Sequence, residues 1–265
     1  MRKFGESIRL YLRFVAAILK STMQYRMSFF LTLIGRFLVE FGSFLGIYFI
    51  FTGFRQIKGY SYGEVLLCFS VIQMSFALAE CAAGGFITFA GMIRQGGFDR
   101  ILLRPRSPIL QVLGSRFTLD RIGTLGNAVI VLVLGIRHSN LIWTPEKVGT
   151  LVLMIAGGVI LFSGLFMIGA AVCFFSVEES GCMNVLTYGG REHGKYPIDI
   201  YGKGMMRFCT YVVPYTLMQY YPLQFLLGKS DNWLYAFYPF GTIVFWLGCY
   251  AVWRFGMRHY ASCGS

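Results

Sequence analysis

The chain has 265 residues, of which 56% are hydrophobic and only 14% are charged, and its mean hydropathy is +0.60. Soluble domains carry about 25% charged residues, so this composition excludes an ordinary soluble domain and indicates a protein built into a membrane. Lys and Arg exceed Asp and Glu by 24 to 12, a formal net charge of +12. Because the basic residues lie mainly in the polar loops, we attribute the excess to membrane topology and contact with anionic lipids, and expect no nucleic-acid partner.

The first 27 residues are too polar to cross a bilayer. Basic residues such as Arg9 and Arg13 share one helical face, whereas apolar residues such as Phe4 and Val15 share another. Residues 1–27 are therefore predicted to form an amphipathic helix on the membrane surface. A cleaved signal peptide is the alternative, but the longest apolar run near the start has only six residues, below the roughly 7–15 required.

Six later segments are apolar and long enough to cross a bilayer as helices, which takes about 20 residues. They are residues 28–54, 63–92, 109–136, 147–176, 203–228 and 233–258. The chain is thus predicted to be an all-α polytopic membrane protein, with a six-span transmembrane domain at 28–258 and a short cytoplasmic tail at 259–265. An even number of spans places both termini on one side.

The distribution of basic residues identifies that side. Sixteen Lys and Arg lie in the N-terminal segment, the loop at 93–108, the region 177–207 and the C-terminal end, against five on the opposite side. Because basic residues gather on the cytoplasmic face, both termini and the 93–108 loop are predicted to be cytoplasmic, in a cell membrane.

The third span is ambiguous at both ends. Its apolar core, residues 122–136, is only fifteen residues long, so it must be extended to span. We extend it backward to residue 109 rather than forward over Arg137 and His138, because this keeps the preceding loop compact.

The fifth span, within residues 196–228, is interrupted by Pro214 and Pro222, which remove helix hydrogen bonds. Broken backbone at membrane depth persists only where protein or a water-filled cavity satisfies it. We therefore expect 196–213 to cross and 214–227 to bend back near the outer face; a simply kinked helix is the alternative.

The first three predicted spans contain ionisable residues, which are costly inside a membrane and usually face a partner. They are Arg36, Glu40, Glu80, Arg116, Asp120 and Arg121. Three bases and three acids can neutralise one another as a structural network of ion pairs. A proton or substrate relay through the same residues is the alternative.

No enzyme machinery is visible in the sequence. The segment Gly189–Lys195 matches the GxxxxGK pattern of a phosphate loop, but Tyr196 follows where Ser or Thr would bind magnesium, and no α/β domain surrounds it. We interpret this segment as a cytoplasmic turn. No CxxC pair or histidine cluster predicts a metal site, and no recognisable catalytic motif occurs. We therefore expect a non-enzymatic chain without a cofactor of its own.

The loop at 93–108 is the one long polar interruption in the first half of the chain, with four arginines around a small apolar patch and glycines and prolines at its ends. With the six spans and the broken fifth span, two stretches carry a resemblance: Gly97–Pro105 (GFDRILLRP), and Tyr196–Tyr201 (YPIDIY) followed by Val213–Tyr215 and Tyr221–Leu223. The chain resembles the permease subunit of a type 2 ABC exporter, from a bacterial branch of that superfamily.

The resemblance implies two six-span permeases, identical or diverged, each docked on a separate ATP-binding cassette subunit that binds ATP and Mg. It also implies a coupling helix in the loop after span two, with the ATPase contact carried by Phe98, Asp99, Arg100, Ile101, Leu102 and Arg104. A loop that only sets topology is the alternative. An ion-coupled secondary transporter using the buried charges, and a membrane scaffold that transports nothing, remain as other functions.

Aromatic and proline residues around the fifth span are candidates for an exit gate: Tyr211, Pro214, Tyr215, Tyr220, Tyr221 and Pro222. Tyrosine at that depth is equally typical of an interfacial belt, and the sequence does not identify the transported substrate.

Overall fold

The computed structural model describes residue 16 and residues 20–139, 141–176 and 181–261. Most of the predicted amphipathic helix at 1–27, and part of the tail at 259–265, therefore lie outside the described residues. Within the described residues the regular structure is helical, apart from an isolated β-bridge between Ile57 and Tyr60. The prediction of an all-α fold is confirmed.

The described part of the chain contains five helical stretches that are long and apolar enough to cross a membrane: Arg26–Gly53, Tyr62–Arg94, Leu119–His138, Pro145–Ser176 and Trp233–Arg258. They correspond to α2 (Arg26–Gly53), α3 (Tyr62–Ile87) with α4 (Phe89–Arg94), η2 (Leu119–Arg121) with α7 (Ile122–His138), α8 (Pro145–Ser176), and η5 (Trp233–Phe240) with α14 (Gly241–Arg258).

Shorter helices connect or accompany these five stretches. They are η1 (Met23–Tyr25), α5 (Gly97–Leu102), α6 (Pro108–Ser115), α9 (Gly181–Asn184), η3 (Val185–Gly189, a π-helical turn), α10 (Gly190–His193), η4 (Ile198–Tyr201), α11 (Lys203–Tyr211), α12 (Tyr215–Met218) and α13 (Tyr220–Leu226).

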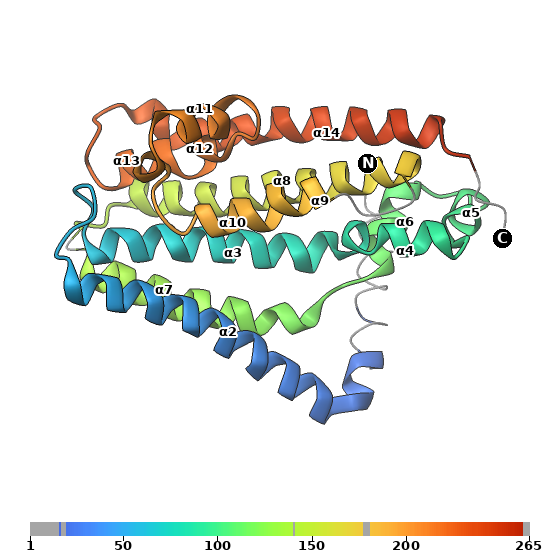
Figure 1. Ribbon diagram of the computed structural model, residues 1–265, viewed down its shortest axis with the longest axis horizontal. Coiled ribbons are helices and arrows are strands. Elements are labelled where there is room, and N and C mark those ends of the chain that lie inside the picture. Colours follow the sequence, from blue (N-terminus) through green and yellow to red (C-terminus); the bar gives the residue numbers. More distant parts are fainter. Residues whose placement is uncertain (1–15, 17–19, 140, 177–180, 262–265) are drawn as a thin grey trace.

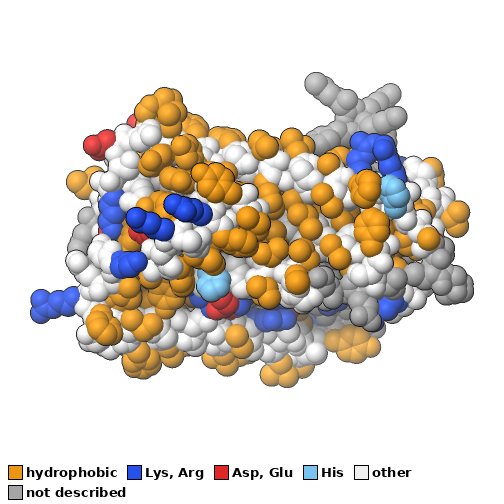
Figure 2. All heavy atoms as spheres, turned by 45° about the horizontal axis from the view of Figure 1, so that its top comes forward, with side chains coloured by type: hydrophobic (Ala, Val, Ile, Leu, Met, Phe, Trp, Pro, Cys, Tyr) orange, Lys and Arg blue, Asp and Glu red, His pale blue; other side chains and the backbone are white. Residues whose placement is uncertain are grey.

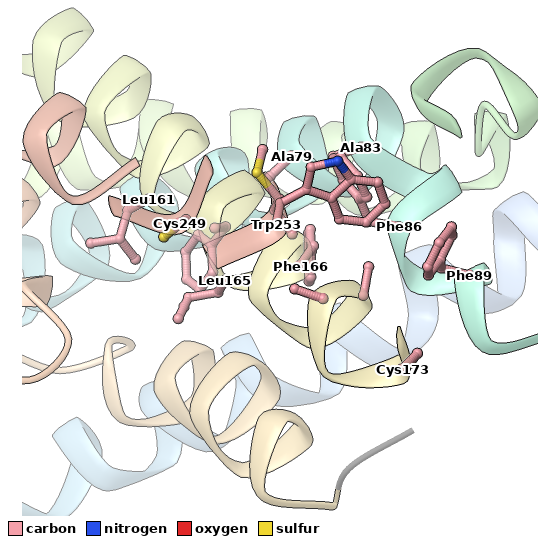
Figure 3. Packing of buried hydrophobic residues seen from close by; sticks show 14 of the residues in the cluster. Ala79, Ala83, Phe86, Phe89, Leu161, Leu165, Phe166, Cys173, Cys249 and Trp253 are labelled. Atoms are coloured by element: carbon pink, nitrogen blue, oxygen red, sulfur yellow. The ribbon is translucent and has the colours of Figure 1, made fainter. Parts of the chain in front are cut away.

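Helix α3 is the centre of the bundle. It packs against α7 and α8, and α14 covers α8 on the far side, while α2 lies on α7 and diverges from the bundle toward its N-terminal end (Figure 1). Small residues allow the close approach: a Cβ on Gly158 of α8 would collide with Ser75 of α3. Between α3, α8 and α14, apolar side chains such as Phe86, Phe166 and Trp253 form one continuous core (Figure 3).

The surface is what a membrane-embedded bundle requires. In Figure 2 hydrophobic side chains cover the middle of the molecule, and Lys and Arg side chains gather mainly toward its two ends. Many large apolar side chains on α2, α7 and α14 are exposed, including Leu31, Val129 and Val244. Exposed aliphatic surface on this scale is stable against hydrocarbon rather than water.

The third predicted span, 109–136, is broken. Helix α6 ends at Ser115, Arg116 is extended, with φ −147° and ψ 123°, and a helix resumes only at Leu119. The membrane helix then continues to His138, so the forward extension that we rejected over Arg137 and His138 is correct. Helix α6 instead packs against α3 at the end of the bundle that carries α4 and α5, which we call the loop end.

The fifth span, predicted within 196–228, is broken as expected, but residues 196–213 do not form its crossing part. Residues 203–228 form the three short helices α11, α12 and α13, which lie near the end of the bundle opposite the loop end (Figure 1). The residues that run between the two ends are instead Gly181–Tyr201, which we call the crossing segment.

This correction also changes the charge count. Arg191 and Lys195 lie inside the bundle, and Lys203 and Arg207 move to the opposite end, so among the described residues the count becomes eight basic residues against seven. The asymmetry is smaller than predicted but keeps its sign.

Candidate functional site

The crossing segment Gly181–Tyr201 contains the short helical pieces α9, η3, α10 and η4 and lies beside α3 and α8 (Figure 1). It begins near α8, where a Cβ on Gly169 would touch Met183, and it ends where Asp199 meets Tyr60 before the start of α3. Its backbone is irregular, so its polar groups need partners from the rest of the bundle.

Two glycines let the crossing segment approach its neighbours closely. A Cβ on Gly190 would collide with the Tyr215 ring, and one on Gly194 would lie 2.7 Å from Ile72 of α3. The Tyr215 hydroxyl donates to the Leu186 carbonyl, and the Gln219 amide donates to the Gly194 carbonyl. Side chains of the α12 region therefore donate hydrogen bonds to backbone carbonyls of the crossing segment.

Glu40 of α2 is a buried acid that faces the crossing segment. Arg191 Nη1 lies 3.0 Å from Glu40 Oε1, and Arg191 Nη2 lies 2.8 Å from Glu192 Oε1. The Gln73 amide of α3 donates to the second oxygen of Glu40. A buried carboxylate is stable only when paired and hydrogen-bonded, so Arg191 ties the crossing segment to both α2 and α3.

Lys195 makes a second attachment to α2. Its Nζ atom lies 2.5 Å from Glu192 Oε2 and donates to Ser43 Oγ at 3.1 Å. Lys195 is buried whereas Glu192 is half-exposed. One acid of the crossing segment therefore bridges its two bases, and both bases also reach α2.

Glu80 of α3 forms a separate buried pair. Arg121 Nη2 lies 2.8 Å from Glu80 Oε1, and the Tyr188 hydroxyl of the crossing segment donates to the same oxygen at 3.4 Å. The Phe76 ring contacts a residue of each cluster: its centroid lies 5.4 Å from the Tyr188 ring centroid and 5.0 Å from the Arg191 guanidinium carbon. The crossing segment thus contacts both ion clusters.

The six ionisable residues predicted to form one network are divided among four places in the structure. Arg36 pairs with Asp120 at 3.3 Å, at a more exposed position than the pair of Glu80 with Arg121. Glu40 pairs with Arg191, which the sequence analysis placed elsewhere. Arg116 is exposed at the break before η2, where it lines an open cavity of about 370 Å³ beside the start of α2.

The prediction that Gly189–Lys195 is a cytoplasmic turn is wrong, because Arg191 and Lys195 are held within the bundle. Sequence reasoning missed them for a definite reason. Three bases and three acids in the first three spans already balanced, so Glu40 did not require a further partner.

The end of the bundle opposite the loop end is held by polar contacts outside the spans. Tyr60 donates to Asp199 Oδ2 at 2.9 Å and accepts from the Gln224 amide at 2.6 Å. Burial, and then the Asp199 carboxylate, raise the pKa of Tyr60, so the hydroxyl keeps its proton and remains a donor. Lys229 pairs with Glu64 at 2.9 Å beside it.

The loop at 93–108 contains a real helix, α5, but part of its apolar patch faces inward. The Phe98 side chain is fully buried, with ring centroids 5.1 Å from Phe89, 5.3 Å from Phe174 and 5.2 Å from Tyr260. Ile101 is also buried. Phe98 and Ile101 therefore anchor α5 within the chain, and their predicted contact with an ATP-binding subunit stays a prediction.

The outward face of the loop consists of other residues. Leu103 is 87% exposed, more than Leu102 at 42%, and Arg100 and Arg104 are exposed as well, whereas Asp99 is half-buried. The Gln111 amide of α6 donates to the Ile101 carbonyl at 3.3 Å and holds the loop against the bundle. Leu103, which was left out of the predicted contact set, is the most exposed apolar group of α5 and its C-cap.

The predicted gate residues do not form one lining. Tyr211 is 85% exposed, Pro214, Tyr215 and Pro222 are buried, and Tyr220 and Tyr221 are half-buried. Tyr221 instead belongs to an aromatic group whose ring centroids lie 5.2 Å from Tyr235 and 4.9 Å from Tyr238. This group joins α13 to η5 near the end opposite α5.

Long apolar helices, an aliphatic outer surface and internally paired charges define a polytopic helical membrane protein. A family model described as ABC-2 family transporter protein matches residues 37–264. The chain belongs to that family and is a membrane permease of an ABC transport system. Comparisons with curated proteins and with solved structures each gave no match.

Proposed function

We propose that the chain is the permease of an ATP-driven export system in a bacterial cell membrane, with the loop end and both termini in the cytoplasm. A second permease, identical or diverged, completes the translocation path. Separate ATP-binding subunits bind ATP and Mg and dock on the loop at 93–108. The chain itself then needs no cofactor and catalyses no reaction.

The arrangement around Phe98 is the observation that carries this proposal. The Phe98 ring packs against the Phe174 ring near the end of α8. The ring centroids of Phe174 and of Trp253 in α14 lie 4.9 Å apart. Side chains packed this tightly move together rather than deform independently. A force on the exposed Leu103 face of α5 is therefore passed to two long helices rather than absorbed in a flexible loop.

Helix α8 gives that movement a route to the opposite end. It contacts α12, α13 and η5 there, which carry Tyr215, Tyr221 and Tyr238. In the proposed cycle, closure of the ATPase dimer shifts α5, and α8 and α14 then alter the packing of these short helices. The tyrosines would serve as the exit gate in that step.

The test is reconstitution in vesicles with the ATP-binding subunit that pairs with this chain. Leu103→Asp places a carboxylate on the proposed docking face, and we expect stimulated ATP hydrolysis and transport to fall about tenfold, the effect of losing about 1.4 kcal/mol of contact. Ile142→Asp is the matched control, because Ile142 is 83% exposed and lies between α7 and α8, away from α5. Equal activity of both variants would refute docking at α5.

Ion-coupled secondary transport is the second candidate, and the buried charges around Glu80 and Glu40 favour it. The same vesicles decide between the two functions. Transport driven by an ion gradient with no ATP-binding subunit present would support the second candidate and exclude the first.

A further inference from the structure

A cavity of about 540 Å³ opens between α8, α13 and η5, at the end of the bundle opposite α5. Residues lining it include Glu146, Gly149, Leu153, Phe225, Trp233 and Phe237. Sites for small organic ligands typically measure about 300–1,000 Å³, with mostly apolar walls and few polar groups. This cavity has that size and composition.

Glu146 is the charged residue of the lining. It lies in the first turn of α8, and within the described residues no ion pair or hydrogen bond reaches its carboxylate; Thr150 donates only to its backbone carbonyl, at 2.9 Å. The next residue, Lys147, is not part of the lining. The cavity therefore presents one negative charge and no opposing positive charge.

The aromatic walls favour the same kind of ligand as the carboxylate does. Trp233 and Phe237 form one side, with ring centroids 5.7 Å apart, and both remain substantially exposed. The faces of aromatic rings attract cations, most strongly those of tryptophan. An anionic ligand would meet Glu146 without any compensating base.

We propose that this cavity binds a lipophilic organic cation. The positive centre of the cation lies against Glu146 and the Trp233 and Phe237 rings. The hydrocarbon part of the cation lies between Leu153 and Phe225. The site is distinct from the docking face of α5, and binding there requires neither ATP nor an ATP-binding subunit.

Gly149 offers a way to block the cavity without disturbing the helices around it. A Cβ added there would have no heavy atom within 4 Å, so Gly149→Leu extends a side chain into open space. Replacing a helical glycine also favours the helix. Loss of binding in a variant that stays folded would therefore report on the cavity itself.

The experiment measures binding of radiolabelled tetraphenylphosphonium to the purified chain in phosphatidylglycerol nanodiscs. We expect Glu146→Gln to weaken binding about tenfold and Gly149→Leu to abolish it, with melting temperatures preserved. Asp231→Asn is the control, because Asp231 is an exposed acid two residues before Trp233 that does not line the cavity; it should bind as the unsubstituted chain does.

Competitors then define the ligand. Dodecyltrimethylammonium should displace the probe and dodecyl sulfate should not. The lipid source is tested at equal surface charge, by mixing either phosphatidylcholine or phosphatidylethanolamine into the phosphatidylglycerol discs. Weaker binding with phosphatidylcholine alone would assign the site to the choline head group of a lipid, and equal binding would assign it to a free amphiphile. The proposal would be overturned if the anionic detergent displaced the probe equally well, or if Glu146→Gln bound it as the unsubstituted chain does. It would also be overturned if Gly149→Leu changed the oligomeric state, because a second copy of the chain would then occupy the cavity.

Discussion

Removal of the Arg191 charge is the most direct perturbation of the crossing segment. The Arg191 and Glu40 side chains are 16% and 6% exposed, and breaking a buried ion pair from one side costs about 3–5 kcal/mol, because the remaining charge is left unpaired. Since Arg191 is partly accessible, we expect Arg191→Gln to cost about 3 kcal/mol. At about 2–4 °C per kcal/mol for a chain of this size, the melting temperature should fall by about 6–12 °C.

The assay is thermal unfolding of the purified protein, completed as a double-mutant cycle. Glu40→Gln alone should destabilise comparably, and Glu40→Gln with Arg191→Gln should recover much of the loss, because neither charge is then left alone. Arg116→Gln is the control, since Arg116 is exposed at the break before η2, and should change stability by less than about 0.5 kcal/mol. Additive losses in the double variant would refute the pairing of Glu40 with Arg191.

Two further variants test the ends of the bundle. Phe98→Ala empties a fully buried aromatic site, so we expect the free energy of unfolding to fall by about 3–5 kcal/mol. We also expect the variant permease to stimulate ATP hydrolysis less, even below its melting temperature. Normal stimulation would contradict transmission through Phe98. Tyr60→Phe removes the hydroxyl that donates to Asp199, so the free energy of unfolding should fall by about 1–2 kcal/mol. Thermal unfolding measures this against Tyr62→Phe, because the Tyr62 hydroxyl makes no hydrogen bond within the described residues. Equal effects of the two substitutions would contradict the role of Tyr60.

The long helices could be predicted because hydrocarbon selects them directly. The segments predicted at 28–54 and 147–176 agree closely with α2 and α8, since a continuous apolar run of that length has few other stable conformations. The break at Arg116 could not be predicted in this way. Residues 109–115 are apolar because α6 packs on α3, not because they cross the membrane.

The crossing segment and the inner face of α5 depend on partners that sequence order does not reveal. Residues 203–228 are more apolar than residues 181–201, so composition favours 203–228 as the crossing stretch. The less apolar stretch crosses instead, because Glu40 faces Arg191 and makes its charge compatible with the interior. Similarly, the pattern around Phe98 predicts a short helix with one apolar side. It does not say whether that side meets another subunit or, as found, Phe174 and Tyr260 of the same chain.

The dependence of Gly181–Tyr201 on its neighbours has a consequence for biogenesis. A nascent segment bearing Arg191, Glu192 and Lys195 gains little by entering lipid alone, since each ionised group is costly at the bilayer centre. Its counter-charge on α2, Glu40, and its hydrogen-bond donors in the α12 region must be present first. We therefore expect this stretch to leave the translocation machinery as a loop and to settle into the membrane last, after residues that the ribosome adds later.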